Sequence, residues 1–194
     1  MTNPLAPDGF DARRHGLESE YFRTQDMELV DKLKNVFHSK LDKDELRTKT
    51  GITNEEVLDR LVAVNVKGEL LTAFKLYPLV EIAWADGSVD ARETQAVMTA
   101  AVKSGVPAGS SALLGLEAWL KRGPTPDGRL AWHAFAAELR KTLTPAELAT
   151  FRRDLMAYAT SVAEASGGIL GMAFQISDAE ARIIKDLEKS LSPA

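Results

Sequence analysis

Hydrophobic residues recur at spacings of three and four along most of the chain, which is the period of an amphipathic α-helix. In the segment 17–41 they form one stripe on an otherwise charged helix: Phe22, Leu29, Val30, Leu33, Val36, Phe37 and Leu41. No segment combines a hydrophobic–polar alternation of period two with enrichment in β-branched residues, as a half-buried strand would. The pattern therefore predicts an all-α fold.

The same period predicts further helices after this stripe. Their predicted ranges are 44–48, 53–64, 67–84, 91–104, 110–120, 130–139, 145–165 and 178–191. Glycine and proline residues separate them, as expected of stop and turn signals between helices. Pro78 lies inside the range 67–84 and lacks an amide hydrogen, so it should kink that helix or restart it as a first-turn residue.

The predicted organisation has four parts. Residues 1–16 contain proline and glycine but no sustained period, which is typical of a flexible tail. Residues 17–66 form an N-terminal helical arm that begins with the amphipathic helix. Residues 67–191 form a compact multi-helix bundle, and residues 192–194 are a short tail.

Four predicted helix starts share one signature. A serine, threonine or aspartate is followed three residues later by a glutamate: Thr53…Glu56, Asp90…Glu93, Thr144…Glu147 and Ser177…Glu180. In such a capping box, the first side chain accepts a backbone hydrogen bond inside the helix, and the glutamate accepts one from the N-cap residue. The signature predicts that the first residue of each pair is a helix N-cap.

Two stretches of the predicted bundle follow a similar pattern, which predicts a weak internal helix-turn-helix repeat. In Ala83–Gly87 and in Ala163–Gly167, a helix ends in Ala-x-Ala, then a small or acidic residue, then a glycine. After a connector, Val89–Glu93 and Ile176–Glu180 each supply a β-branched residue, an N-cap and a glutamate. The second connector is longer.

The strings that carry this repeat are AWADGSVDARETQAV in the first half, and SVAEASGGILG with ISDAEARIIKDLEK in the second. They resemble the two halves of a TerB-like domain of the bacterial tellurite-resistance type, over roughly residues 67–191. The resemblance implies a compact helical bundle, bacterial origin, a link to metal-oxyanion stress and no established enzymatic activity. It also implies candidate metal ligands around the Ala-Asp-Gly turns. The first turn keeps Asp86, whereas the second has Ser166 in its place.

Four acidic residues around the first turn are candidate ligands for a divalent cation. They are Glu81, Asp86, Asp90 and Glu93. Calcium and magnesium take several oxygen ligands, and a tight turn between two antiparallel helices brings such carboxylates together. The spacing does not match an EF-hand, and the same residues also fit a capping box and turn chemistry. A calcium or magnesium site and a purely structural role therefore both remain open.

No motif for catalysis stands out. The chain has no cysteine, and its three histidines, His15, His38 and His133, lie on separate predicted elements. No His-Glu-x-x-His or Glu-x-x-His pair occurs, so zinc hydrolases and carboxylate di-iron proteins lack their ligands. Gly167-Gly168 follow a helix and lack the Gly-Lys-Ser/Thr of a phosphate loop. An enzyme with an unrecognised carboxylate site remains an alternative.

The composition of the chain limits the classes of partner that we expect the protein to bind. A formal net charge of −4 makes a nucleic-acid binder an unfavourable prediction, because such proteins usually present a basic face. The hydrophobic content of 45% supports a globular core. No apolar run approaches the ~18 residues of a membrane helix, and the first residues lack the apolar core of a signal peptide. We therefore expect a cytoplasmic protein without membrane insertion.

The N-terminal stripe is a candidate surface for a partner. Its residues Phe22, Leu29, Leu33 and Phe37 could be buried against another protein or a second copy of the chain, or alternatively against the chain's own bundle. The predicted function is a non-enzymatic binding or stress-associated module resembling TerB-like tellurite-resistance proteins. The alternatives are a divalent-metal-binding protein that uses residues 81–93, and the enzyme named above.

Overall fold

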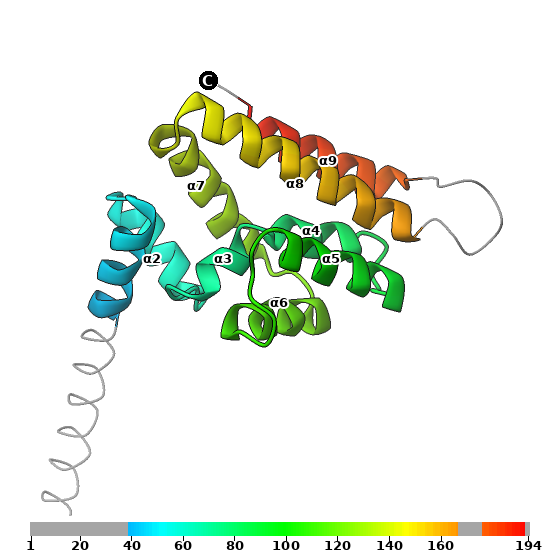
Figure 1. Cartoon of the computed structure of the whole chain (residues 1–194), viewed down its shortest axis with the longest axis horizontal. Helices are drawn as coiled ribbons and strands as arrows, with labels where there is room; N and C mark the ends of the chain where they lie inside the picture. The colour runs from blue at the N-terminus through cyan, green and yellow to red at the C-terminus, as the bar shows by residue number, and fades with distance from the viewer. Residues whose placement is uncertain (1–38, 167–175, 193–194) are drawn as a thin grey trace, which may run out of the picture. The chain divides into compact units, whose positions relative to one another are not determined.

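The computed structural model describes residues 39–166 and 176–192 (Figure 1). Within these ranges every regular element is a helix and no strand occurs, which confirms the predicted all-α fold. The chain divides into two compact units, Met1–Leu41 and Asp42–Ala194. The predicted tail over 1–16 and the predicted stripe residues Phe22, Leu29, Leu33 and Phe37 lie outside the described residues.

Residues 39–50 are helical and precede a series of shorter and longer helices. These are α2 (Glu55–Ala63), α3 (Leu70–Phe74), α4 (Tyr77–Ala83), α5 (Ala91–Lys103), α6 (Ser111–Arg122), α7 (Pro126–Thr142), α8 (Pro145–Ser166) and α9 (Asp178–Ser190). The helices in the described part of the chain do not combine the length and hydropathy needed to cross a bilayer.

The predicted arm overlaps the second compact unit. The predicted short helix over 44–48 is part of a longer one, since residues 39–50 form one uninterrupted helix. Leu46, Ile52 and Leu58 are fully buried in the same hydrophobic core as the later helices, and α2 packs against α7. Residues 42–66 therefore pack with the bundle.

Pro78 restarts the helix, as predicted. The range 67–84 contains two helices, α3 and α4, and Pro78 occupies the first turn of α4. A proline costs little there because the first backbone N–H groups of a helix have no partner within it. The Leu79 N–H donates to the Leu76 carbonyl at 2.9 Å and closes the turn.

Three of the four predicted capping boxes are confirmed. Asp90 with Glu93 and Ser177 with Glu180 each make both reciprocal hydrogen bonds. At the start of α8, the Glu147 N–H donates to the Thr144 hydroxyl at 3.3 Å, and the Thr144 N–H donates to Glu147 Oε2 at 2.9 Å.

The prediction for Thr53 is wrong. Asn54 is the N-cap of α2, and its side-chain oxygen accepts from the N–H groups of Glu56 and Val57 at 3.1 and 3.4 Å. Asparagine is at least as good an N-cap as threonine. The Asn54 amide also donates to Glu138 at 3.2 Å, which ties the cap to α7.

Asp90→Ala is expected to lower the free energy of unfolding by about 1 kcal/mol, within a range of roughly 0.5–2 kcal/mol. The substitution leaves the N–H groups of Arg92 and Glu93 without their acceptor. Thr53→Ala is the matched control, because exposed Thr53 makes no cap. Urea denaturation of both variants checks this. Equal losses in the two would contradict the cap assignment.

The start of α7 lies earlier than predicted. Residues 123–128 read as a connector, yet Thr125 caps α7 and its hydroxyl accepts the Gly128 N–H at 3.0 Å. Pro126 then occupies the first turn, where its fixed φ suits a helix. Position 128 lies inside this helix and yet holds a glycine. A Cβ there would meet the Tyr77 hydroxyl at 2.2 Å, so no larger residue fits.

Helix α4 lies at the centre of the second unit. All of its residues are buried, and it packs against α5, α6, α7, α8 and α9. Helix α5 packs against α8, and α8 and α9 run side by side (Figure 1). The helix pairs α4–α5 and α8–α9, the two units of the predicted repeat, therefore lie against each other.

Candidate functional site

The turn between α4 and α5 holds Asp86 in a local hydrogen-bond network. Asp86 Oδ1 accepts from the Ser88 N–H at 3.0 Å and from the Ser88 hydroxyl at 3.4 Å. Gly87 follows with φ +92°, a conformation that favours glycine. This is the hydrogen bonding of an Asx turn, in which an aspartate side chain bonds the backbone two residues later.

Asp90 and Glu93 meet at the start of α5. Asp90 Oδ1 accepts from the Arg92 and Glu93 N–H groups at 2.7 and 2.9 Å, and Glu93 Oε2 accepts from the Asp90 N–H at 2.8 Å. Glu93 is only 3% exposed. Burial raises its pKa to about 7, although the hydrogen bond from Asp90 opposes the change. The negative charges of Asp90, Asp86 and Glu180 raise that pKa further.

Glu180 is a member of this acidic cluster that the sequence patterns did not predict. It is 4% exposed at the start of α9, where its Oε2 accepts from the Ser177 N–H at 2.7 Å. Its negative charge acts on Glu93 because the helix pair α4–α5 packs against the helix pair α8–α9. The repeated signature marked both glutamates as caps, but their proximity depends on tertiary packing.

Glu81 is engaged elsewhere. It is buried on α4, and Arg129 of α7 donates its Nε–H to Glu81 Oε1 at 3.2 Å. Burial raises the pKa of Glu81 above its ordinary value, while the charge and hydrogen bond of Arg129 oppose the rise. Of the predicted ligands, Asp86, Asp90 and Glu93 therefore act on one another, whereas Glu81 pairs with a cation.

Among the described residues, no group of three or more histidine, aspartate or glutamate side chains is arranged to hold a metal ion. We expect calcium or magnesium to leave the melting temperature unchanged relative to a control of matched ionic strength. A saturable stabilisation, about 2.7 kcal/mol at ~100 times the dissociation constant, would instead establish binding. Its loss in Asp86→Asn, which keeps the turn and removes the charge, would assign it to this cluster.

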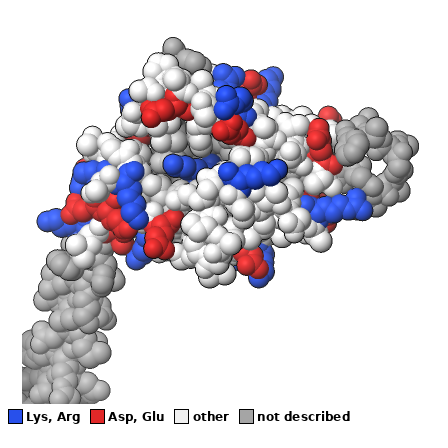
Figure 2. Space-filling model, viewed as in Figure 1, with Lys and Arg blue, Asp and Glu red and all other residues white. Residues whose placement is uncertain are grey.

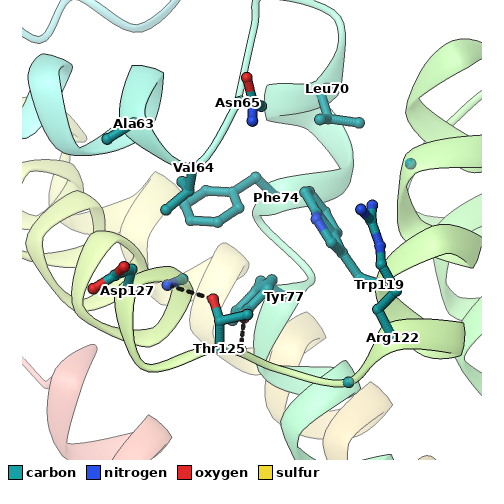
Figure 3. A pocket seen from close by; sticks show the side chains of 13 residues that line it. Ala63, Val64, Asn65, Leu70, Phe74, Tyr77, Trp119, Arg122, Thr125 and Asp127 are labelled. Atoms are coloured by element: carbon teal, nitrogen blue, oxygen red, sulfur yellow. Dashed lines mark hydrogen bonds between the residues drawn. The ribbon is translucent and has the colours of Figure 1, made fainter.

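A second feature is a pocket of about 350 Å³ beside α3, α6 and the start of α7, here called the aromatic pocket (Figure 3). Its lining residues are Ala63, Val64, Asn65, Leu70, Phe74, Tyr77, Gly115, Trp119, Arg122, Gly123, Thr125, Asp127 and Gly128. They come from sequence segments that the fold brings together.

Three aromatic rings form the inner wall of this pocket. The Tyr77 ring centroid lies 5.4 Å from that of Phe74 and 5.5 Å from that of Trp119, and the Tyr77–Trp119 pair is edge-to-face. Phe74 and Trp119 are 5.8 Å apart. The Tyr77 hydroxyl accepts the Thr125 N–H at 2.9 Å, which fixes the ring against the start of α7. The wall is therefore held in place before any ligand binds.

Glycines allow the helices to approach one another at the pocket. A Cβ on Gly115 of α6 would meet the Leu70 side chain of α3 at 2.0 Å, and a side chain at Gly128 would displace Tyr77. A single glycine within a predicted helix does not by itself predict a pocket. Helical spacing predicts which apolar residues face a core but not which of them line a pocket, so sequence analysis missed this site.

Two opposite charges flank the pocket. In Figure 3 the Arg122 side chain lies beside Trp119, and Asp127 lies on the other side of the Tyr77 and Phe74 rings. Arg122 Nε donates to the Ala118 carbonyl at 3.3 Å. In the part of the chain that the structure describes, neither Arg122 nor Asp127 forms an ion pair. The pocket thus offers a cation and an anion to a ligand.

Comparison with protein-family models gave no match, and comparisons with curated proteins and with solved structures gave none either. The resemblance to TerB-like domains stays a prediction from the sequence. The candidate site consequently rests on the geometry of the aromatic pocket and on the acidic cluster.

Proposed function

We propose that the protein is a non-enzymatic ligand-binding module of the bacterial cytoplasm and that the aromatic pocket is its binding site. The observation that carries the proposal is a preformed aromatic wall flanked by Arg122 and Asp127. Small-molecule sites are typically concave and apolar, of roughly 300–1,000 Å³, with a few polar groups that orient the ligand. The pocket has this character.

The two charges suggest a zwitterionic ligand with an apolar or aromatic body. A guanidinium forms strong, directional hydrogen bonds with a carboxylate, which suits Arg122. Asp127 suits an ammonium group. The partly exposed faces of Leu70, Val64 and Trp119 would contact the body. A short peptide with an aromatic side chain has all three parts, and its ammonium and carboxylate lie at opposite ends, as Asp127 and Arg122 do in the pocket.

The hydroxyl groups of the pocket support binding over catalysis. The Tyr77 hydroxyl holds the Thr125 N–H, and the Thr125 hydroxyl holds the Gly128 N–H. Among residues 39–166 and 176–192, neither hydroxyl bonds to a side chain that could act as its base, which nucleophilic catalysis requires. A role in stress caused by metal oxyanions follows only from the TerB-like resemblance and is part of this proposal.

We expect the dipeptide phenylalanyl-phenylalanine to shift the amide resonances of pocket residues in a titration followed by NMR. Its N-acetyl derivative lacks the ammonium and its C-terminal amide lacks the carboxylate, so both should bind more weakly. Arg122→Ala should weaken binding of the dipeptide about 10-fold or more, because a charge-assisted hydrogen bond is lost. Lys121→Ala is the control, since Lys121 pairs with Glu117 and does not line the pocket.

Shifts that are confined to the pocket and reduced in Arg122→Ala would support the proposal. Equal affinity for the three probes would refute the zwitterion assignment. The absence of pocket shifts with all of them would count against this site as the carrier of function.

A further inference from the structure

A groove follows α8 on a different part of the second unit from the aromatic pocket. It consists of three hollows of about 440, 290 and 570 Å³. Lys75 and Phe151 line both the first and the second hollow, and Lys103 and Tyr158 line both the second and the third. Neighbouring hollows therefore share walls, and together we call them the α8 groove.

One face of α8 forms the length of this groove. Its groove-lining residues recur at helical spacing: Ala146, Glu147, Thr150, Phe151, Asp154, Leu155, Tyr158 and Ser161. From Ala146 to Ser161 the helix rises about 22 Å, at ~1.5 Å per residue. That length suits a second helix of about four turns lying along α8.

The groove carries basic groups that are available for a partner. Lys75, Arg92 and Lys103 line it, and within the described ranges none of them forms an ion pair. The acidic side chains are engaged: Glu147 bonds to Thr144, and Asp154 pairs with Arg153 at 3.0 Å. Figure 2 shows basic side chains across the middle of the face seen in Figure 1. The groove therefore favours an acidic, amphipathic helix.

The chain itself contains such a segment. Residues 17–31 have five acidic residues, Glu18, Glu20, Asp26, Glu28 and Asp31, and one basic residue, Arg23, so their net charge is 1 − 5 = −4. As a helix, fifteen residues would also span about 22 Å. Phe22 and Leu29 are seven residues apart in the predicted stripe, the same separation as Phe151 and Tyr158 in the groove. Residues 17–31 therefore match the α8 groove in length, in charge and in the spacing of their apolar residues.

We propose that residues 17–31 of a second copy of this chain bind in the α8 groove, so that two copies exchange their N-terminal segments. Neither glycine nor proline occurs between residues 17 and 50. The lack of a turn residue in the predicted helix favours binding to the groove of a second copy over folding back onto its own groove. Reciprocal exchange also closes the assembly as a two-fold dimer, the commonest symmetry of soluble oligomers.

The test is the oligomeric state of the full chain, measured by sedimentation equilibrium over a range of concentrations. We expect the wild type to dimerise. Glu28→Lys with Asp31→Lys reverses charge on the segment, and Lys75→Glu with Lys103→Glu reverses it in the groove. Each pair should weaken dimerisation about 10-fold or more, because like charges then face each other. Combining the two pairs should restore much of the affinity.

Lys185→Glu with Lys189→Glu is the control, since both residues lie on α9 and neither lines the groove. It should dimerise as the wild type does. Restoration in the combined variant also shows that the separate charge reversals did not act by unfolding the protein. A wild type that stays monomeric, as it would if the segment bound its own groove, overturns the proposal. So does a dimer that neither charge reversal weakens.

Discussion

Phe74→Ala is expected to lower the free energy of unfolding by about 3–5 kcal/mol, the usual cost of removing a buried phenylalanine ring. Phe74 is 1% exposed, and the rings of Tyr77, Trp119 and Phe135 lie 5.4, 5.8 and 6.0 Å from it. Alanine would leave a cavity between α3, α6 and α7 that large aromatic neighbours cannot close. Urea denaturation followed by circular dichroism measures the loss.

Leu114→Ala is the matched control, because Leu114 is a large apolar residue that is 61% exposed on α6. We expect its effect to stay within about 0.5 kcal/mol, as for most surface substitutions. A loss below about 1 kcal/mol for Phe74→Ala would mean that the core has rearranged, and the packing described for this region would be wrong.

Glu93→Gln is expected to stabilise the protein by about 1–3 kcal/mol at about pH 8 and to have little effect near pH 4.5. The folded state raises the pKa of Glu93 from 4.5 to about 7, chiefly by burial. Between pH 4.5 and about pH 7, the folded protein thus retains the Glu93 proton, whereas the unfolded chain releases it. The contribution of Glu93 to stability is complete below pH 4.5 and is lost as the pH rises through about 7. Glutamine keeps the acceptor for the Asp90 N–H without the charge.

Glu147→Gln is the control, because we expect it to change the free energy of unfolding in the opposite direction to Glu93→Gln. Hydrogen bonds from the Thr144 hydroxyl and N–H lower the pKa of Glu147, so its charge favours the folded state at neutral pH. Glutamine should therefore destabilise the protein there. Unfolding curves of both variants at several pH values make the comparison. A Glu93→Gln effect that does not change with pH would contradict the assignment.

Short-range signals predicted the helices well because they act within a few residues. Three capping boxes and the first-turn role of Pro78 were readable from spacing alone. Asn54 rather than Thr53 caps α2, and the Asn54 amide also donates to Glu138 of α7, a distant partner that a local sequence pattern does not reveal. Local patterns thus predicted that a helix begins there but not at which residue.

The candidate site depends on contacts that local patterns do not contain. The acidic cluster needs Glu180, which lies far along the chain from Glu93, and the aromatic pocket needs Gly115 beside Leu70. The prediction that Glu81 joins the cluster assumed that neighbours in sequence share a surface. Buried Glu81 instead bonds to Arg129, because all sides of α4 are covered by other helices.

The burial of α4 has a consequence for the synthesis of the protein. The helices that cover α4 include α8 and α9, and Leu187 and Leu191 of the last helical region belong to the same core as Leu46. A chain emerging from the ribosome therefore exposes apolar α4 until nearly all of the bundle has been made. The hydrophobic core can close only after translation of α9, so we expect the nascent chain to need protection of its apolar segments until then.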